Sequence, residues 1–168
     1  FAYEKNYQLI YVAGQLNSNT ETFVEGSLET TTFANSMQHL ACDPSGVIYM
    51  NHKNTGQSGS LIYINEPENY SKFLDYGAST ENGGSPSTPY YDDKTEKVYF
   101  CAHHAPFFWE VDPKDSWSFV KRKLIAPDAS YQAKGYRPVP SGQKLEYMCS
   151  YARATDANGE SFIYCRTW

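Results

Sequence analysis

Short apolar and aromatic runs alternate with polar turn residues along the whole chain. The stretch at residues 42–51 (CDPSGVIYMN) is the clearest case, because Asp, Pro, Ser and Gly come directly before a β-branched and aromatic run. Pro44 fixes φ for a turn, and Gly46 can adopt the positive φ that closes a tight connection. The pattern predicts a β-hairpin at this point of the chain.

The same unit occurs three times. Residues 91–101 (YDDKTEKVYFC) and 138–149 (PVPSGQKLEYMC) repeat the polar turn followed by an aromatic strand. Tyr49, Tyr99 and Tyr147 hold the same place in the three copies and are spaced by about 50 residues. A repeat of this length indicates a surface-building β architecture.

More strands follow each copy of the unit. Short apolar runs at residues 61–65, 108–112 and 162–166 predict one strand in every copy. Alternating apolar and polar residues at 70–77 and 117–125 predict a further, half-exposed strand in the first two copies. The sequence therefore predicts about four strands in each repeat of about 48 residues, which is the size of a propeller blade.

These repeats predict an all-β fold, a β-propeller of four-stranded blades. Residues 1–168 form a single propeller region, with approximate repeats at 11–77, 78–126 and 127–168 and a possible closing strand at 7–14. Propellers typically have about four to eight blades, so three repeats indicate part of a larger ring. The alternatives are an assembly of two half-rings and a different β fold such as a sandwich.

Composition and charge narrow the classes of partner. The 168 residues include 15 Tyr, 9 Phe and 3 Trp, and the net charge is −5 with a pI near 5.3. An acidic chain has no basic field to hold phosphates, which argues against nucleic-acid binding and favours a cationic or neutral partner. No apolar run approaches the roughly 20 residues that a membrane-spanning helix needs. Since the first residues do not have the layout of a signal peptide, we expect a mature chain or an excised piece.

The four cysteines, Cys42, Cys101, Cys149 and Cys165, have no C-x-x-C spacing, which disfavours a zinc ribbon. Each lies in an apolar run, so we expect buried free thiols that act as small hydrophobic side chains. A bridge between Cys149 and Cys165 across one hairpin is the alternative, and the sequence alone leaves the disulfide state open.

Residues 11–64 resemble the NHL repeat, a β-propeller family. The matching segments are VAGQ at 12–15, EGSLETTTF at 25–33 and LACDPSGVIYMNHKN at 40–54. The later copies keep the turn and the Tyr strand but lose the Gly-bearing linker. After Asn51 and His52 the family continues into a basic strand, whereas this chain continues into a longer polar loop, which we place at the rim of the propeller.

The resemblance implies a scaffold for binding and little chemistry. NHL-like propellers mostly bind proteins, nucleic acids or glycans, and a few are metal-dependent lyases or hydrolases. The chain is also similar in style to secreted or surface-anchored propeller proteins of Bacteroidetes bacteria that accompany outer-membrane nutrient importers. That similarity implies an exported, lipoprotein-type protein at the cell surface. Because one fold serves many functions, the function must be argued from the residues.

The densest cluster of reactive side chains is CAHHAPFFWE at residues 101–110. His103 or His104 could bind a metal or act as a base, with Asp92, Asp93 or His52 nearby. Adjacent strand residues point to opposite faces, so both histidines cannot easily serve one metal. We favour a structural or rim role, which His52 would share at the corresponding place in the first copy. We therefore assign no catalytic residue, metal or cofactor.

Aromatic residues beside prolines and glycines are the candidate binding platforms. Most aromatic residues on strands belong to the core, whereas Phe107, Tyr131, Tyr136 and Tyr151 flank loops. Such rings suit the C–H faces of a sugar, and they suit a peptide as well.

The leading hypothesis is a non-enzymatic binding module that presents rim-loop aromatic residues to a glycan or peptide. We expect His52, His103, His104, Phe107, Tyr131, Tyr136 and Tyr151 to bind the ligand. The rival is an NHL-like metal-dependent lyase or hydrolase that uses His103 and His104. The third hypothesis is a structural scaffold that meets a protein partner in an outer-membrane complex.

Overall fold

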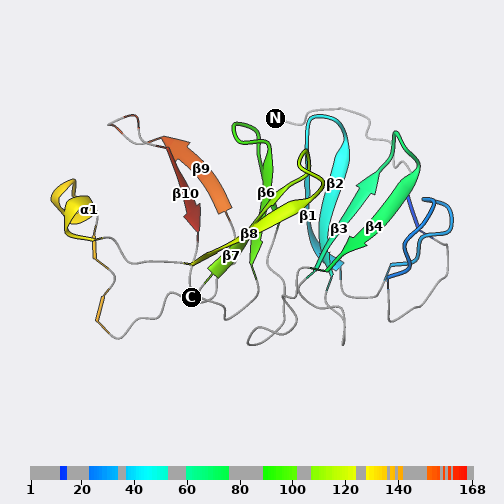
Figure 1. Ribbon diagram of the computed structural model, residues 1–168, viewed down its shortest axis with the longest axis horizontal. Helices are drawn as coiled ribbons and strands as arrows, with labels where there is room; N and C mark the ends of the chain where they lie inside the picture. The colour runs from blue at the N-terminus through cyan, green and yellow to red at the C-terminus, as the bar shows by residue number, and fades with distance from the viewer. Residues whose placement is uncertain are drawn as a thin grey trace, which may run out of the picture.

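The computed structural model describes residues 12–14, 23–33, 37–52, 60–75, 89–101, 107–123, 128–135, 137–138, 140–141, 151–155, 157, 159 and 161–165. At some strand positions only the backbone is described. Within these ranges the chain forms three antiparallel sheets and one short helix (Figure 1). The expected all-β fold class is therefore confirmed.

The first sheet is a four-stranded meander. It contains β1 (Met37–Cys42), β2 (Val47–His52), β3 (Ser60–Asn65) and β4 (Tyr70–Leu74), with neighbouring strands paired in sequence order. The hairpin expected around residues 42–51 is confirmed, and the strands expected at 61–65 and 70–77 are β3 and β4.

The second sheet repeats this arrangement. It contains β5 (Tyr90–Asp92), β6 (Lys97–Cys101), β7 (Phe107–Asp112) and β8 (Ser118–Lys123), again paired in sequence order. The strands expected at 108–112 and 117–125 are β7 and β8. Trp117 precedes β8 and lies in the turn, not in the strand.

The third sheet is smaller than the first two, and a short helix lies near it in the sequence. A two-stranded sheet pairs β9 (Tyr151–Thr155) with β10 (Ser161–Cys165), and β5 lies against β9. The helix α1 (Ala129–Ala133) is capped by Asp128, whose carboxylate accepts the backbone N–H of Ser130 at 2.9 Å and of Tyr131 at 3.2 Å. The three sheets follow one another along the long axis of the molecule, and α1 lies at one end (Figure 1).

The main core lies between the first two sheets. Side chains of β2 and β3 meet side chains of β6 and β7 there, and all of them are buried: Tyr49, Leu61, Val98, Phe100, Trp109 and Val111. Cross-strand neighbours in the second sheet, Val98 opposite Val111 and Phe100 opposite Trp109, place these four on one face. The two sheets therefore pack face to face through one apolar layer.

A second core covers the other face of the first sheet. Ile62 and Ile64 of β3 pack against Phe23 and Leu28, which belong to residues 23–33. This segment joins β4 through a bridge between Gly26 and Ser71 and lies beside the first sheet (blue in Figure 1). Both faces of β3 are thus covered, which explains the continuous apolar and aromatic run LIYI at residues 61–64.

Two expectations are limited or corrected by the structure. Cys42 is a free thiol as expected, but it is exposed and not buried, and it is the last residue of the edge strand β1. Each sheet falls inside one of the three expected ranges, 11–77, 78–126 and 127–168, and this division stays a prediction. Most of the expected closing strand at 7–14 and of the third turn segment lies outside the described residues.

Candidate functional site

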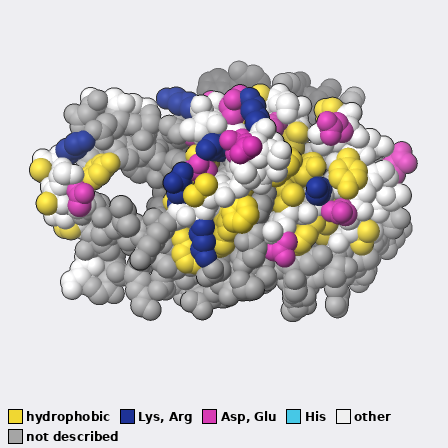
Figure 2. All heavy atoms as spheres, in the orientation of Figure 1, with side chains coloured by type: hydrophobic (Ala, Val, Ile, Leu, Met, Phe, Trp, Pro, Cys, Tyr) yellow, Lys and Arg dark blue, Asp and Glu magenta, His cyan; other side chains and the backbone are white. Residues whose placement is uncertain are grey.

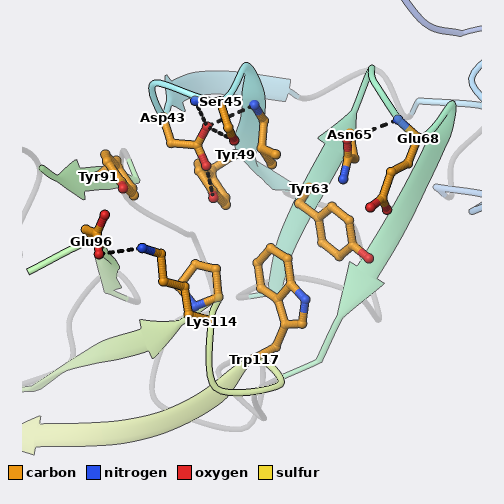
Figure 3. Close-up of a pocket in the computed structure, with 12 residues that line it drawn as sticks. Asp43, Ser45, Tyr49, Tyr63, Asn65, Glu68, Tyr91, Glu96, Lys114 and Trp117 are labelled. Atoms are coloured by element: carbon orange, nitrogen blue, oxygen red, sulfur yellow. Dashed lines mark hydrogen bonds and ion pairs between the residues drawn. The ribbon is translucent and has the colours of Figure 1, made fainter.

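A groove opens between the first two sheets at the end where their hairpin turns lie (Figure 3). Its volume is about 310 Å³, and we call it the inter-sheet groove. Both sheets contribute to its lining, which consists of Asp43, Ser45, Val47, Tyr49, Tyr63, Asn65, Glu68, Tyr91, Glu96, Pro113, Lys114 and Trp117. The groove therefore exists only when both sheets are folded and packed together.

Each hairpin turn around the groove begins with an aspartate or asparagine. In every case a backbone N–H two or three residues later donates to the side-chain oxygen at 2.8–3.2 Å. The four residues are Asp43, Asn65, Asp92 and Asp112. Such side chains hold the turn in place of a second backbone hydrogen bond.

Each turn also ends with a residue in the left-handed region. Gly46 has φ of 92°, Asn69 of 52° and Glu96 of 55°, while the last turn has two such residues, Ser116 at 49° and Trp117 at 60°. Glycine and asparagine tolerate this conformation, whereas glutamate, serine and tryptophan adopt it at a cost. Two of these three strained residues, Glu96 and Trp117, line the groove.

Four aromatic side chains form the floor and walls of the groove. Trp117 reaches from the second sheet to stack on Tyr63 of the first, with 4.2 Å between ring centroids and 8° between ring planes. Tyr49 and Tyr91, also from different sheets, lie parallel within 2° at 6.1 Å. Tyr49 meets Trp117 at 57°. These contacts join the two sheets at the groove and explain how the strain at Trp117 is offset.

Asp43 is the best-anchored carboxylate in the groove. Its Oδ2 accepts the Tyr49 hydroxyl at 2.7 Å, and its Oδ1 accepts the Ser45 hydroxyl at 2.6 Å and the Val47 N–H at 3.1 Å. Burial alone would raise the pKa of Asp43, but these hydrogen bonds lower it below the ordinary value of 3.8. Asp43 is therefore an anion at neutral pH.

The remaining charged residues lie at the mouth of the groove. Lys114 Nζ is 2.5 Å from Glu96 Oε2, and both side chains are largely exposed. Glu68 lies on the β3–β4 turn beside Asn65, whose amide oxygen accepts the Glu68 N–H at 3.2 Å (Figure 3). The lining thus contains three carboxylates and one ammonium group.

Burial and nearby charges raise the pKa values of the three tyrosines of the groove. Burial first, and then the hydrogen bond and charge of Asp43, raise the pKa of Tyr49 far above its ordinary value. Burial followed by nearby tyrosine and glutamate charges raises the pKa of Tyr63, and burial followed by Asp43 and Glu96 raises that of Tyr91. All three are neutral phenols that can donate hydrogen bonds at neutral pH.

The aromatic residues expected to bind ligand are not part of this groove where the structure describes them. Phe107 is half-buried in β7, in an edge-on contact with Trp109, and Lys121 Nζ lies 3.7 Å from its ring centroid. The lysine occupies one face of the ring. Tyr131 is exposed on α1, and Lys134 Nζ lies 5.3 Å from its ring.

The other expected site residues are only partly described. His52 ends β2 at the end of the strand opposite the groove, and Tyr151 begins β9, but the side chains of both lie outside the described residues. His103, His104 and Tyr136 lie outside the described residues altogether. Their proposed roles stay predictions.

Asp92, considered above as a metal partner for the histidines, is already engaged. It is fully buried, and its carboxylate accepts the Thr95 hydroxyl at 2.8 Å and the Lys94 N–H at 3.2 Å. Within the described ranges no three His, Cys, Asp or Glu residues lie close enough together to hold a metal ion.

In the same ranges, no helix has the length and apolar character that crossing a bilayer requires.

The sequence contains a signal for the groove in its repeated hairpin turns. The hairpin at Asp43–Tyr49 is the clearest of these turns, and an equivalent turn precedes Tyr99. Turns that repeat in a β-meander lie at one end of their sheets, so their side chains converge. Polar turn residues and the aromatic residues next to them form the described site, and the expected platform residues Phe107 and Tyr131 do not line it.

Comparison with known proteins leaves this geometry as the basis for any assignment. No family model matches the chain, and no curated protein or solved structure does either.

Proposed function

We propose that the chain is a non-enzymatic binding module that holds a group of a glycan or peptide in the inter-sheet groove. The observation that carries the proposal is the joining of Tyr49, Tyr63, Tyr91 and Trp117, from two sheets, around one cavity. Ligand sites are typically concave and lined by aromatic side chains with a few polar groups that fix orientation. Asp43, Asn65 and Glu68 supply those polar groups here.

We further propose that the first two sheets are consecutive blades of a propeller that resembles the NHL family. Two four-stranded meanders of like order, packed face to face through one apolar layer, support this arrangement. In a propeller, turns from neighbouring blades lie on one face of the ring, so the groove would open on that face. The proposal includes export to the cell surface, where such a face meets glycans or peptides.

Replacing Trp117 by alanine tests the binding site. Wild-type chain and Trp117→Ala are screened on glycan and peptide arrays, and affinities for the hits are then measured by calorimetry. We expect Trp117→Ala to weaken binding about tenfold or more, because it removes one wall of the groove.

Phe119→Ala is the matched control, since Phe119 is 49% exposed on β8 and does not line the groove. Its affinity should equal that of the wild type, and circular dichroism should show that both variants are folded. Binding that survives Trp117→Ala but is lost in Tyr131→Ala or Phe107→Ala would move the site to the loop aromatics and contradict this assignment.

A further inference from the structure

We propose that the inter-sheet groove binds the positively charged side chain of a peptide, an ammonium or guanidinium group, in preference to a neutral sugar. This inference rests on the function proposed above and names the ligand class for the same groove. It is carried by the charge of the lining, by the aromatic faces and by the size of the cavity.

The lining of the groove has an excess of negative charge. Lys114 is the single cationic residue of the lining, and it is already paired with Glu96 at 2.5 Å. Asp43 receives its hydrogen bonds from neutral donors, which leave its negative charge uncompensated. Within the described residues, neither Asp43 nor Glu68 takes part in an ion pair. The groove therefore retains two uncompensated negative charges, one on each turn of the first sheet.

Aromatic rings line the groove beside these charges. A cation is attracted to the face of a tryptophan or tyrosine ring within about 6 Å, more strongly where water is excluded. Trp117, Tyr63 and Tyr91 stand between the carboxylates of the groove (Figure 3). The chain makes such a contact elsewhere, where Lys121 lies over Phe107 and Trp109. Basic side chains gather beside apolar ones around β8 on the face shown in Figure 2.

The electrostatic potential inside the groove is negative, which favours a cation. After burial, the charges that raise the pKa of Tyr63 include Glu68, and those that raise the pKa of Tyr91 begin with Asp43. The same field stabilises a ligand cation and gives a neutral sugar ring no comparable advantage. The net charge of −5 also attracts a cationic ligand over longer distances.

The size of the cavity sets the scale of the ligand group. At about 310 Å³ the groove is at the lower end of the roughly 300–1,000 Å³ typical of ligand pockets. It therefore accommodates one side chain of a peptide, with the peptide backbone left at the mouth near Lys114 and Glu96.

Small probes separate charge from shape. N-acetyl-lysine amide and N-acetyl-arginine amide are titrated into the full chain by calorimetry, beside their neutral counterparts N-acetyl-norleucine amide and N-acetyl-citrulline amide. Glucose and N-acetylglucosamine are titrated in parallel. We expect each cationic probe to bind about tenfold tighter than its neutral counterpart and to weaken as salt is raised.

Charge variants locate the effect. Glu68→Gln should weaken the cationic probes about two- to fivefold, and Lys114→Gln should strengthen them by a similar factor, because it removes a competing cation. For each variant, the change in the affinity of a neutral probe should be smaller than the change in the affinity of its cationic counterpart. Glu29→Gln and Arg137→Gln are the matched controls, since each removes one exposed charge outside the lining and should leave all affinities unchanged.

The outcomes distinguish the two proposals. Sugars that bind in a Trp117-dependent way while the cationic probes do not would overturn the cation preference and leave the binding function intact. If no probe binds up to its solubility limit, or if Trp117→Ala leaves every affinity unchanged, both proposals are overturned.

Discussion

At the scale of single residues, two positions define each turn around the groove. The first is an aspartate or asparagine whose side chain accepts backbone N–H groups, and the last is a residue with positive φ. Asp43 and Gly46 are one such pair, and Asn65 and Asn69 are another. The side-chain acceptor satisfies backbone donors that the turn would otherwise leave unpaired.

Gly46→Ala should lower the free energy of unfolding by about 1–2 kcal/mol. Gly46 has φ of 92°, and a Cβ added there would meet nothing within 4 Å, so the cost is purely conformational. Urea unfolding measures it. Gly46→Asn is the control and should recover part of the loss, because asparagine tolerates the left-handed region. Equal stability of all three chains would contradict this account.

The sequence predicts some of these residues and not others. Asp43, Pro44 and Gly46 form a turn signal that depends only on neighbouring residues, and the structure confirms it. The alternating run that begins at Trp117 predicts a strand at this residue. Its φ of 60° is adopted because its ring packs on Tyr63, more than 50 residues away, and no local pattern contains that contact.

At the scale of strands, the ion pairs of one glutamate join three neighbouring strands of the second sheet, β6, β7 and β8. Glu110 of β7 accepts from Lys97 of β6 at 2.7 Å and from Arg122 of β8 at 3.2 Å. Burial would raise the pKa of Glu110, but Arg122 and Lys97 lower it below the ordinary value of 4.5. The ion pairs therefore stabilise the sheet when the carboxylate is ionised.

Glu110→Gln should lower the free energy of unfolding by about 1 kcal/mol at neutral pH, a modest value because Arg122 is half exposed. A folded-state pKa below the unfolded one gives stability that is present above about pH 4.5 and is lost as the pH falls through the folded-state pKa. Wild type and variant should thus converge once the pH lies below the folded-state pKa of Glu110, as urea titrations at a series of pH values would show. Glu29→Gln is the control, and a difference that persists at low pH would contradict the ion-pair explanation.

Strands with strong apolar patterns were predictable, and short or polar ones were not. β3 and β7 carry apolar runs that stand out in the sequence, and both were expected. β5 has three residues and β9 reads YARAT, so neither shows a period-2 pattern that could be recognised. The helix α1, with five residues, is likewise shorter than the helical periodicity needs.

At the scale of the whole molecule, the first sheet lies between two other parts of the chain. The second sheet covers one of its faces, and residues 23–33 cover the other. Meanders with this strand order could be expected from the repeat. The packing of one sheet on the next, and with it the groove, depends on side chains far apart in the sequence, such as Leu61 and Val98.

Leu28→Ala should lower the free energy of unfolding by about 2–5 kcal/mol, since Leu28 is buried against the first sheet. Val24→Ala in the same segment is the control and should cost much less, because Val24 is 50% exposed. Urea unfolding of both variants gives the comparison. Similar losses in the two would mean that residues 23–33 do not form part of the core.

The construction of the turns has an evolutionary consequence. The first and last residues of a turn hold the backbone, whereas Glu68 and Lys114 lie between those positions and face the groove. Mutation at the intermediate positions leaves the hairpins intact while it alters what the groove recognises. Gene duplicates of such a chain can therefore diverge in ligand preference through one or two substitutions, without passing through an unfolded ancestor.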